Sequence, residues 1–297
     1  MPRPDVHRLG VKYRRTPLLA IGRDVYLDTR LIITKLSEVE PGHENARLSV
    51  ATTPEQLALQ HLLHAYVMNT GFTANAIQLI ALHNKAWMDP AFIKDRTELI
   101  GTGAFFSDEV LKQTRPEAIR VVRSGFDFLE RTLLSDGREW LLGTKGPSIG
   151  DLDMAWSLLW MERVPGAIPE EWISKEIFPK VFAWMERFKD AATQALEDLG
   201  TPTTLTGDEA AQLVLGSEYH EVEGQVDEGD ALVQLQGLKK GQLIRVWPTD
   251  TGSNHKELGE LVSLDAKEVV IEAKAEEGGS VRIHAQRHGF AVTSYEE

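Results

Sequence analysis

The chain has 297 residues, of which 42% are hydrophobic and 26% charged, a composition typical of a globular protein with two or three domains. The net charge of −13 argues against a nucleic acid as the main partner, because such binding relies on Lys and Arg to neutralise phosphates. The sequence contains no cysteine, which excludes disulfides, thiolate metal sites and a cysteine nucleophile within it. Since the N-terminus lacks the apolar run of a secretory signal and no window resembles a membrane span, we expect a cytoplasmic protein without membrane contact.

The first forty residues predict a small α/β domain. Two short apolar runs, 18–21 and 25–27, flank the turn Gly22-Arg23-Asp24 and indicate a hairpin. The apolar spacing of residues 29–36 is that of a helix, and Asp28 is placed to cap its N-terminus by accepting hydrogen bonds from free backbone N–H groups.

Residues 50–200 predict an all-helical domain. The segment Thr53-Pro54-Glu55-Gln56 combines a capping threonine, a proline at the first helical position and a glutamine that closes a capping box. A second helix is expected after Pro116, where apolar residues recur every three or four positions. Ser148-Ile149-Gly150-Asp151 is another capping box, which opens a very apolar helix expected at the centre of a bundle. A last helix is expected at 178–199.

Residues 208–297 predict a small β-rich domain. The composition of Gly200 to Asp208 is that of a linker, and short β-type runs separated by Gly, Asp, Lys and Glu follow it. Several short strands at close spacing favour a small barrel or sandwich. The predicted organisation is therefore a partial α/β domain at 1–40, a helical domain at 50–200 and a β-rich domain at 208–297.

Residues 13–36 and about 50–199 together resemble a cytosolic glutathione S-transferase of a kind seen in fungi. The resemblance implies that the first domain is thioredoxin-like, that the second is the family's helical bundle, and that glutathione is the co-substrate bound between them. It also implies a reaction in which the glutathione thiolate attacks an electrophilic small molecule, in detoxification or in secondary metabolism.

The resemblance implies a glutathione site at two dipeptides. In the family a cis proline follows a residue whose backbone pairs with the cysteinyl part of glutathione, and Thr16-Pro17 matches this pair. An acidic residue followed by Ser or Thr at a helix start holds the γ-glutamyl end, and Asp28-Thr29 matches that pair. The chemistry suits the ligand, because a helix N-terminus attracts a carboxylate and Asp28 can pair with an ammonium group.

Four further residues lie on helices that would face the cleft in this family. They could line a pocket for the electrophile or pack in the core: Tyr66, Asn69, His83 and Trp87. We expect no metal site, because His61 and His64, three apart on a helix, have no acidic residue nearby to complete one.

The sequence also departs from the family pattern. The family opens with a strand, a helix and a strand, and the first strand ends in the Tyr, Ser or Cys that stabilises the thiolate. Only twelve residues precede Tyr13, which is itself too close to Pro17 for that role, so no catalytic residue is assigned. We expect either an N-terminally truncated sequence or a hairpin sheltered by the helical domain or by a second subunit, since an isolated hairpin is marginal in water.

Two hypotheses follow for the function. The first is a glutathione transferase-like protein that conjugates or binds glutathione, for which a homodimer is one compatible state. The alternative is a non-catalytic binding or scaffolding protein built on the same fold. A metabolite-binding protein that does not use glutathione is a third reading.

Overall fold

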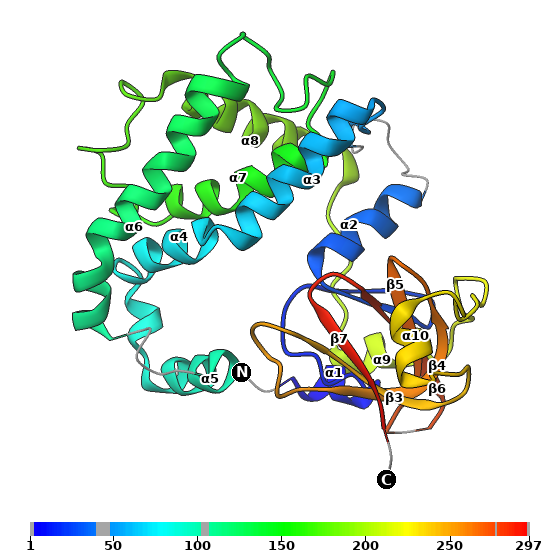
Figure 1. Ribbon diagram of the computed structural model, residues 1–297. Coiled ribbons are helices and arrows are strands. Elements are labelled where there is room, and N and C mark those ends of the chain that lie inside the picture. Colours follow the sequence, from blue (N-terminus) through cyan, green and yellow to red (C-terminus); the bar gives the residue numbers. More distant parts are fainter. Residues whose placement is uncertain (1–2, 40–47, 102–106, 277, 296–297) are drawn as a thin grey trace. The chain divides into compact units, whose positions relative to one another are not determined.

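The structure is a computed structural model that describes residues 3–39, 48–101, 107–276 and 278–295 (Figure 1). Within these ranges the chain forms two compact units. Unit 1 combines residues 1–40, 94–102 and 203–297, and unit 2 combines residues 41–93 and 103–202. The polar composition of residues 38–47, with Pro41-Gly42, predicts a linker, of which residues 40–47 lie outside the described residues and Glu38 belongs to helix α2.

Unit 1 is built on a sheet that has seven strands among the described residues (Figure 1). Their order across the sheet is β1-β2-β6-β5-β4-β3-β7, and each neighbouring pair is antiparallel except β2 and β6, which are parallel. The strands are β1 (Leu18–Ile21), β2 (Asp24–Leu27), β3 (Leu243–Pro248), β4 (Glu257–Leu264), β5 (Glu268–Lys274), β6 (Ser280–Gln286) and β7 (Phe290–Ser294).

The N-terminal hairpin and the C-terminal strands share this one sheet, whereas the sequence predicted two separate domains at 1–40 and 208–297. Strand β6 pairs with the free edge of β2, with Val25 opposite Ile283, and all four residues of β2 are buried. The physical reason is that a two-stranded hairpin cannot hide its open edge by itself. The C-terminal segment therefore shelters the hairpin, a role that the sequence analysis gave to the helical domain or a second subunit.

Four helices pack in unit 1: α1 (Pro4–Arg8), α2 (Thr29–Glu38), α9 (Gly207–Leu215) and α10 (Ala231–Gln236). The start of α9 lies inside the predicted linker, because Thr206 and Glu209 form a capping box there. The C-terminal part of α5 (Pro90–Ile100) also belongs to unit 1, although it falls within the predicted helical domain. Arg14 holds it through an ion pair with Asp95 at 2.6 Å.

Unit 2 is helical, as predicted. Its elements include α3 (Pro54–Asn69), α4 (Phe72–Ala81), η2 (Lys85–Met88), α6 (Asp108–Phe128), the π-helical turn η4 (Leu129–Leu133), α7 (Ile149–Glu162) and α8 (Pro179–Leu199). Helix α6 begins eight residues before Pro116, where the sequence predicted its start, because Ser107 accepts a hydrogen bond from the N–H of Val110 and caps the helix earlier. Pro116 is exposed inside the helix.

The capping box at the start of α7 lies in the core of unit 2. The Asp151 carboxylate is fully buried and accepts hydrogen bonds from the backbone N–H of Ser148 at 2.9 Å and of Leu141 at 2.8 Å. It also accepts one from the indole N–H of Trp184 at 2.9 Å. This carboxylate therefore joins α7, α8 and the segment before α7, and its role is structural.

Candidate functional site

The corner between β2 and α2 holds a residue with an unusual backbone. Asp28 has φ 72° and ψ 135°, and among the described residues it is the one non-glycine residue with a positive φ. Such a conformation costs on the order of 1–3 kcal/mol and is concentrated at functional sites. The Asp28 side chain caps α2, as the sequence predicted, by accepting a hydrogen bond from the N–H of Arg30 at 3.1 Å.

The structure brings together the four residues predicted to bind glutathione. In the β1–β2 ladder Leu18 lies opposite Leu27, so the chain before β1 and the chain after β2 meet at the same end of the hairpin. Thr16 and Pro17, joined by a cis peptide bond, lie there beside Asp28 and Thr29. Thr16, Pro17 and Thr29 are exposed. Their proposed roles stay predictions.

Two further residues contact Asp28 that the sequence analysis did not identify. The Arg15 guanidinium lies 3.6 Å from the Asp28 carboxylate, and the amide of Gln286 donates to the same carboxylate at 3.3 Å. Arg15 is fixed from the other side by an ion pair with Asp250 and by donating to the carbonyl of Thr251 at 2.7 Å and 3.0 Å. No local sequence signal points to Gln286 or Asp250, which lie more than 200 positions away from this corner.

Tyr13 lies beneath this corner and is shielded from solvent. Its ring packs against Phe290 and under the Arg15 guanidinium, and its hydroxyl is buried without a hydrogen-bond partner within the described residues. Burial first, and the charge of Asp28 second, raise the pKa of the Tyr13 phenol. Tyr13 is therefore a buried, neutral phenol, which agrees with leaving it out of the catalytic assignment.

The fold is similar to that of a solved structure. A GST-like protein from Pseudomonas syringae, known from its crystal structure, matches 99% of this chain and 86% of its own, with a TM-score of 0.66 and 22% sequence identity. This chain has a GST-like fold. A protein-family profile described as a domain of unknown function (DUF7962) matches residues 75–197, which lie mostly in unit 2. No curated protein matches the chain.

A cluster of charged side chains in unit 1 surrounds the buried Asp24 of β2. His284 lies between the carboxylates of Asp24, 2.8 Å from one ring nitrogen, and Glu268, 2.5 Å from the other. Burial by itself would lower the pKa of His284, but these two hydrogen bonds outweigh burial and raise it. The Lys35 ammonium completes the cluster by pairing with Glu221 at 2.6 Å and with Glu268 at 3.0 Å.

This cluster has the composition of a metal site, because ligand atoms of Glu221, Glu268 and His284 lie within 4.8 Å of one another. Lys35 already supplies the positive charge that the two glutamates attract. The cluster is therefore best explained as a network that ties α2, β2, β5 and β6 together. No local sequence signal predicts this cluster, since Asp24 and His284 are 260 positions apart.

The residues suggested for a co-substrate pocket lie in unit 2 and form separate contacts. Tyr66 packs against Phe72 and Phe128, with ring centroids 5.7 Å and 5.4 Å away. Trp87 packs against Trp160 at 5.5 Å. Asn69 and His83 are exposed. The two aromatic residues are thus partly in the core, and their role in binding a ligand stays a prediction.

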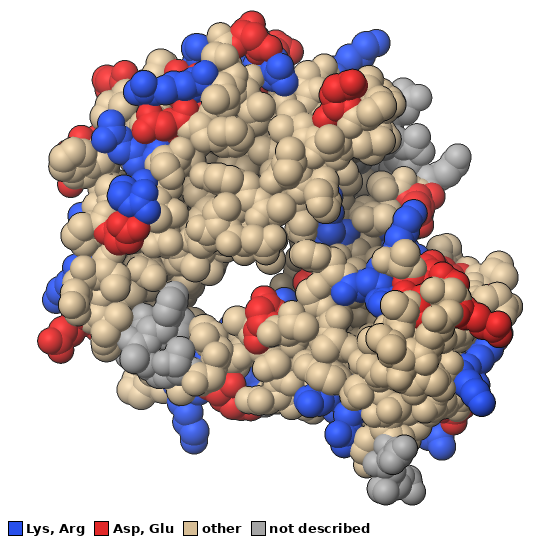
Figure 2. Space-filling view, viewed as in Figure 1, with Lys and Arg blue, Asp and Glu red and all other residues tan. Residues whose placement is uncertain are grey.

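The surface of unit 2 is apolar where three of its helices lie. On the face shown in Figure 2, charged side chains lie toward the margins of the unit, and its middle, over α3, α4 and α7, is largely uncharged. Large apolar side chains of α3 and α7 are exposed, including Leu57, Leu62, Met68 and Trp156. Such a surface suits an apolar small molecule better than a charged one.

Proposed function

We propose that this protein binds glutathione at the β2–α2 corner and presents its thiol to an electrophilic small molecule, as a GST-like protein. The observation that carries the proposal is the strained backbone of Asp28, which turns its carboxylate to the start of α2 beside the exposed Thr29. Strain of this kind persists where the position serves a ligand.

Each part of the corner has a partner in glutathione. The γ-glutamyl carboxylate would accept hydrogen bonds from the first turn of α2 and from the Thr29 hydroxyl. The γ-glutamyl ammonium would pair with Asp28. The Asp28 carboxylate can accept a further hydrogen bond besides its contacts with Arg15, Arg30 and Gln286. The backbone of Thr16, an exposed residue, would pair with the cysteinyl residue.

The non-catalytic alternative is favoured by one observation. A free thiol has a pKa near 8.5, and a transferase must lower it to form the thiolate at neutral pH. Tyr13, the tyrosine nearest in sequence to the site, has its hydroxyl buried, so a bound thiol does not reach it.

Among the helices that the structure describes, none is both long enough and apolar enough to cross a bilayer. A cytoplasmic protein with a small-molecule ligand remains part of the proposal.

Isothermal titration calorimetry with glutathione and with the dipeptide Cys-Gly tests the proposal. Because the γ-glutamyl group would make the charged contacts, we expect glutathione to bind at least tenfold more tightly than Cys-Gly, which corresponds to about 1.4 kcal/mol or more. Equal binding, or no binding of glutathione, would overturn the proposal.

A conjugation assay then separates the two hypotheses. Turnover of 1-chloro-2,4-dinitrobenzene and glutathione above the uncatalysed rate would identify a transferase. Tight glutathione binding without turnover would identify a binding protein.

A further inference from the structure

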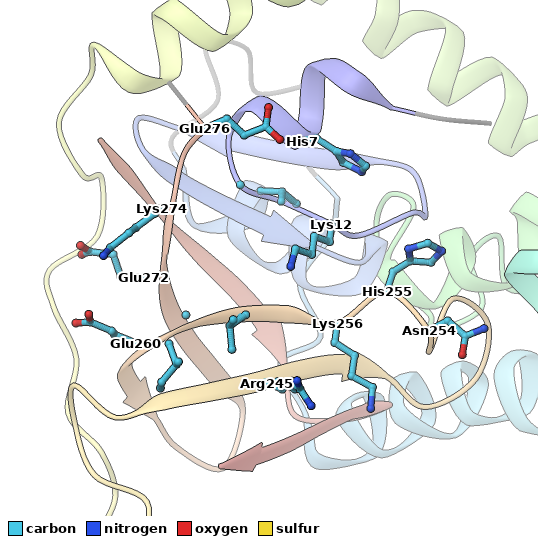
Figure 3. A pocket seen from close by; sticks show the side chains of 15 residues that line it. His7, Lys12, Arg245, Asn254, His255, Lys256, Glu260, Glu272, Lys274 and Glu276 are labelled. Atoms are coloured by element: carbon cyan, nitrogen blue, oxygen red, sulfur yellow. The ribbon is translucent and has the colours of Figure 1, made fainter. Parts of the chain in front are cut away.

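A cavity lies in unit 1 over β3, β4 and β5, and none of the residues of the glutathione proposal lines it (Figure 3). Its volume is about 860 Å³, which lies in the range of small-molecule sites. The segment between α1 and Lys12 forms one wall. This segment can lie close to the sheet because Gly10, at φ +77°, has no Cβ, and a Cβ there would lie 2.2 Å from the carbonyl oxygen of Lys274.

Three cationic side chains belong to one side of this cavity. Arg245 on β3 lies opposite Leu258 on β4, so Lys256, two residues before Leu258, is on the same face of the sheet as Arg245. Lys12 is fixed next to them, since its backbone N–H donates to both carboxylate oxygens of Glu257, at 2.9 Å and 3.0 Å. Figure 3 shows the side chains of Lys12, Arg245 and Lys256 along this side. We call these three residues the basic triad.

The basic triad keeps its charge available. The structure gives none of its side chains an ion pair within the described residues, although the chain as a whole carries a net charge of −13. Two of the three are instead held by aromatic rings. The Arg245 guanidinium lies 4.1 Å from the centroid of the Tyr295 ring, and the Lys256 ammonium lies 4.1 Å from that of Trp247. A cation–π contact fixes a cation without neutralising it.

Two of the acidic residues that line the cavity lie away from the basic triad. Glu260 on β4 and Glu272 on β5 are cross-strand neighbours, and Figure 3 shows them away from Lys12 and Lys256, with Lys274 beside Glu272. The third acidic residue, Glu276, lies beside His7. The positive charge of the basic triad is therefore separated from Glu260 and Glu272, and an anionic group of a ligand would be placed at the triad.

We propose that this cavity is a binding site for a small molecule with an anionic group, a phosphate or a carboxylate, which the basic triad holds. Arg245 offers the planar set of donors that suits both groups, and the two lysines add point charges. The part of the ligand toward Glu260 and Glu272 is neutral or positively charged. The site is independent of glutathione binding.

Calorimetric titration of the full chain at low salt, with inorganic phosphate and with acetate, tests the proposal and distinguishes the two kinds of anionic group. We expect the wild type to bind at least one of them, and the double variant Arg245→Gln, Lys256→Gln to bind it at least tenfold more weakly, because the variant loses two positively charged hydrogen-bond donors. Added salt should weaken binding to the wild type.

The matched control is the double variant Lys239→Gln, Lys267→Gln, which removes two exposed positive charges of the same unit outside the cavity. It should bind as the wild type does. If the Arg245 and Lys256 variant does not fold by circular dichroism, the single change Lys12→Gln at an exposed position replaces it. The proposal is overturned if neither anion binds the wild type, or if the cavity variant and the control variant bind equally.

Discussion

Two aspartates near helix N-termini of this protein, Asp151 and Asp28, lie in opposite surroundings. Asp151 in the first turn of α7 is fully buried and accepts four hydrogen bonds, from the backbone N–H groups of Leu141 and Ser148, the Ser148 hydroxyl and the indole N–H of Trp184. Asp28 at the start of α2 has a strained backbone, and exposed residues lie on both sides of its corner. The comparison teaches that a carboxylate which accepts from several buried donors stabilises the fold, whereas Asp28, at a strained corner with exposed neighbours, is the carboxylate that we propose for a ligand.

The largest effect is expected from removing the buried carboxylate. Asp151→Ala leaves four buried donors without this acceptor, on Leu141, Ser148 (N–H and hydroxyl) and Trp184, and each unsatisfied donor costs on the order of 1–3 kcal/mol. We expect the free energy of unfolding, measured by urea denaturation, to fall by about 3 kcal/mol or more. Asp190→Ala, at an exposed position of α8 in the same unit, is the control and should leave it nearly unchanged. Equal effects of the two changes would remove Asp151 from its structural role.

Strand β2 offers an intermediate case, because Asp24, four residues before Asp28, is buried against His284. The hydrogen bonds of His284 to Asp24 and Glu268 raise its pKa in the folded protein despite burial. A raised folded-state pKa means that this stabilisation is complete below the unfolded value of about 6.5 and is lost as the pH rises through the folded value.

We therefore expect the difference in unfolding free energy between the wild type and His284→Gln to be largest in mild acid. It should shrink at higher pH, by at most about 1.4 kcal/mol per pH unit. The difference between the two proteins is the quantity to measure, because burial also raises the pKa of Glu257 to about 7. The titration of Glu257 changes the pH dependence of the unfolding free energy equally in both proteins and cancels in the difference. A difference that stays constant from about pH 5.5 to pH 9 would show that His284 does not change its charge there.

A smaller effect, of opposite sign, is expected at the strained corner. Asp28→Gly relieves the positive φ, and glycine in the cap position costs only a few tenths of a kcal/mol. We expect stability to rise by up to about 1 kcal/mol while glutathione binding weakens. A loss of stability as large as that of Asp151→Ala would mean that Asp28, like Asp151, mainly stabilises the fold.

The smallest effect is expected at Tyr13. Its hydroxyl is buried without a hydrogen-bond partner, so Tyr13→Phe should leave stability unchanged or raise it by about 1 kcal/mol at most. Any conjugation activity should also stay the same. A fall in turnover with unchanged glutathione binding would assign Tyr13 to the thiolate after all.

The sequence predicted those parts of the fold that depend on neighbouring residues. The caps at Asp28, Thr53 and Ser148 were found because each lies within a few positions of the N–H group that it binds. The start of α6 was misplaced because Pro116 is a strong boundary signal, yet an exposed proline is tolerated inside a helix that Ser107 caps earlier.

The parts that the sequence could not predict depend on distant residues. The pairing of β2 with β6, and with it the union of residues 1–40 and 208–297 in one sheet, has no local signal. The same holds for the contact of Asp28 with Gln286, which arises only because β6 lies next to β2. The GST-like resemblance located the Thr16-Pro17 and Asp28-Thr29 pairs, but not the side chains that surround them.

The most direct test of the central claim compares glutathione binding to Asp28→Asn and Asp230→Asn by calorimetry. Both aspartates cap a helix and pair with an arginine in unit 1, Asp28 with Arg15 and Asp230 with Arg287, and asparagine preserves the cap while removing the charge. We predict that Asp28→Asn weakens glutathione binding by roughly tenfold or more, through the loss of a charged contact, and that Asp230→Asn leaves it unchanged. Equal affinity of the two variants would contradict the assignment of the β2–α2 corner as the glutathione site.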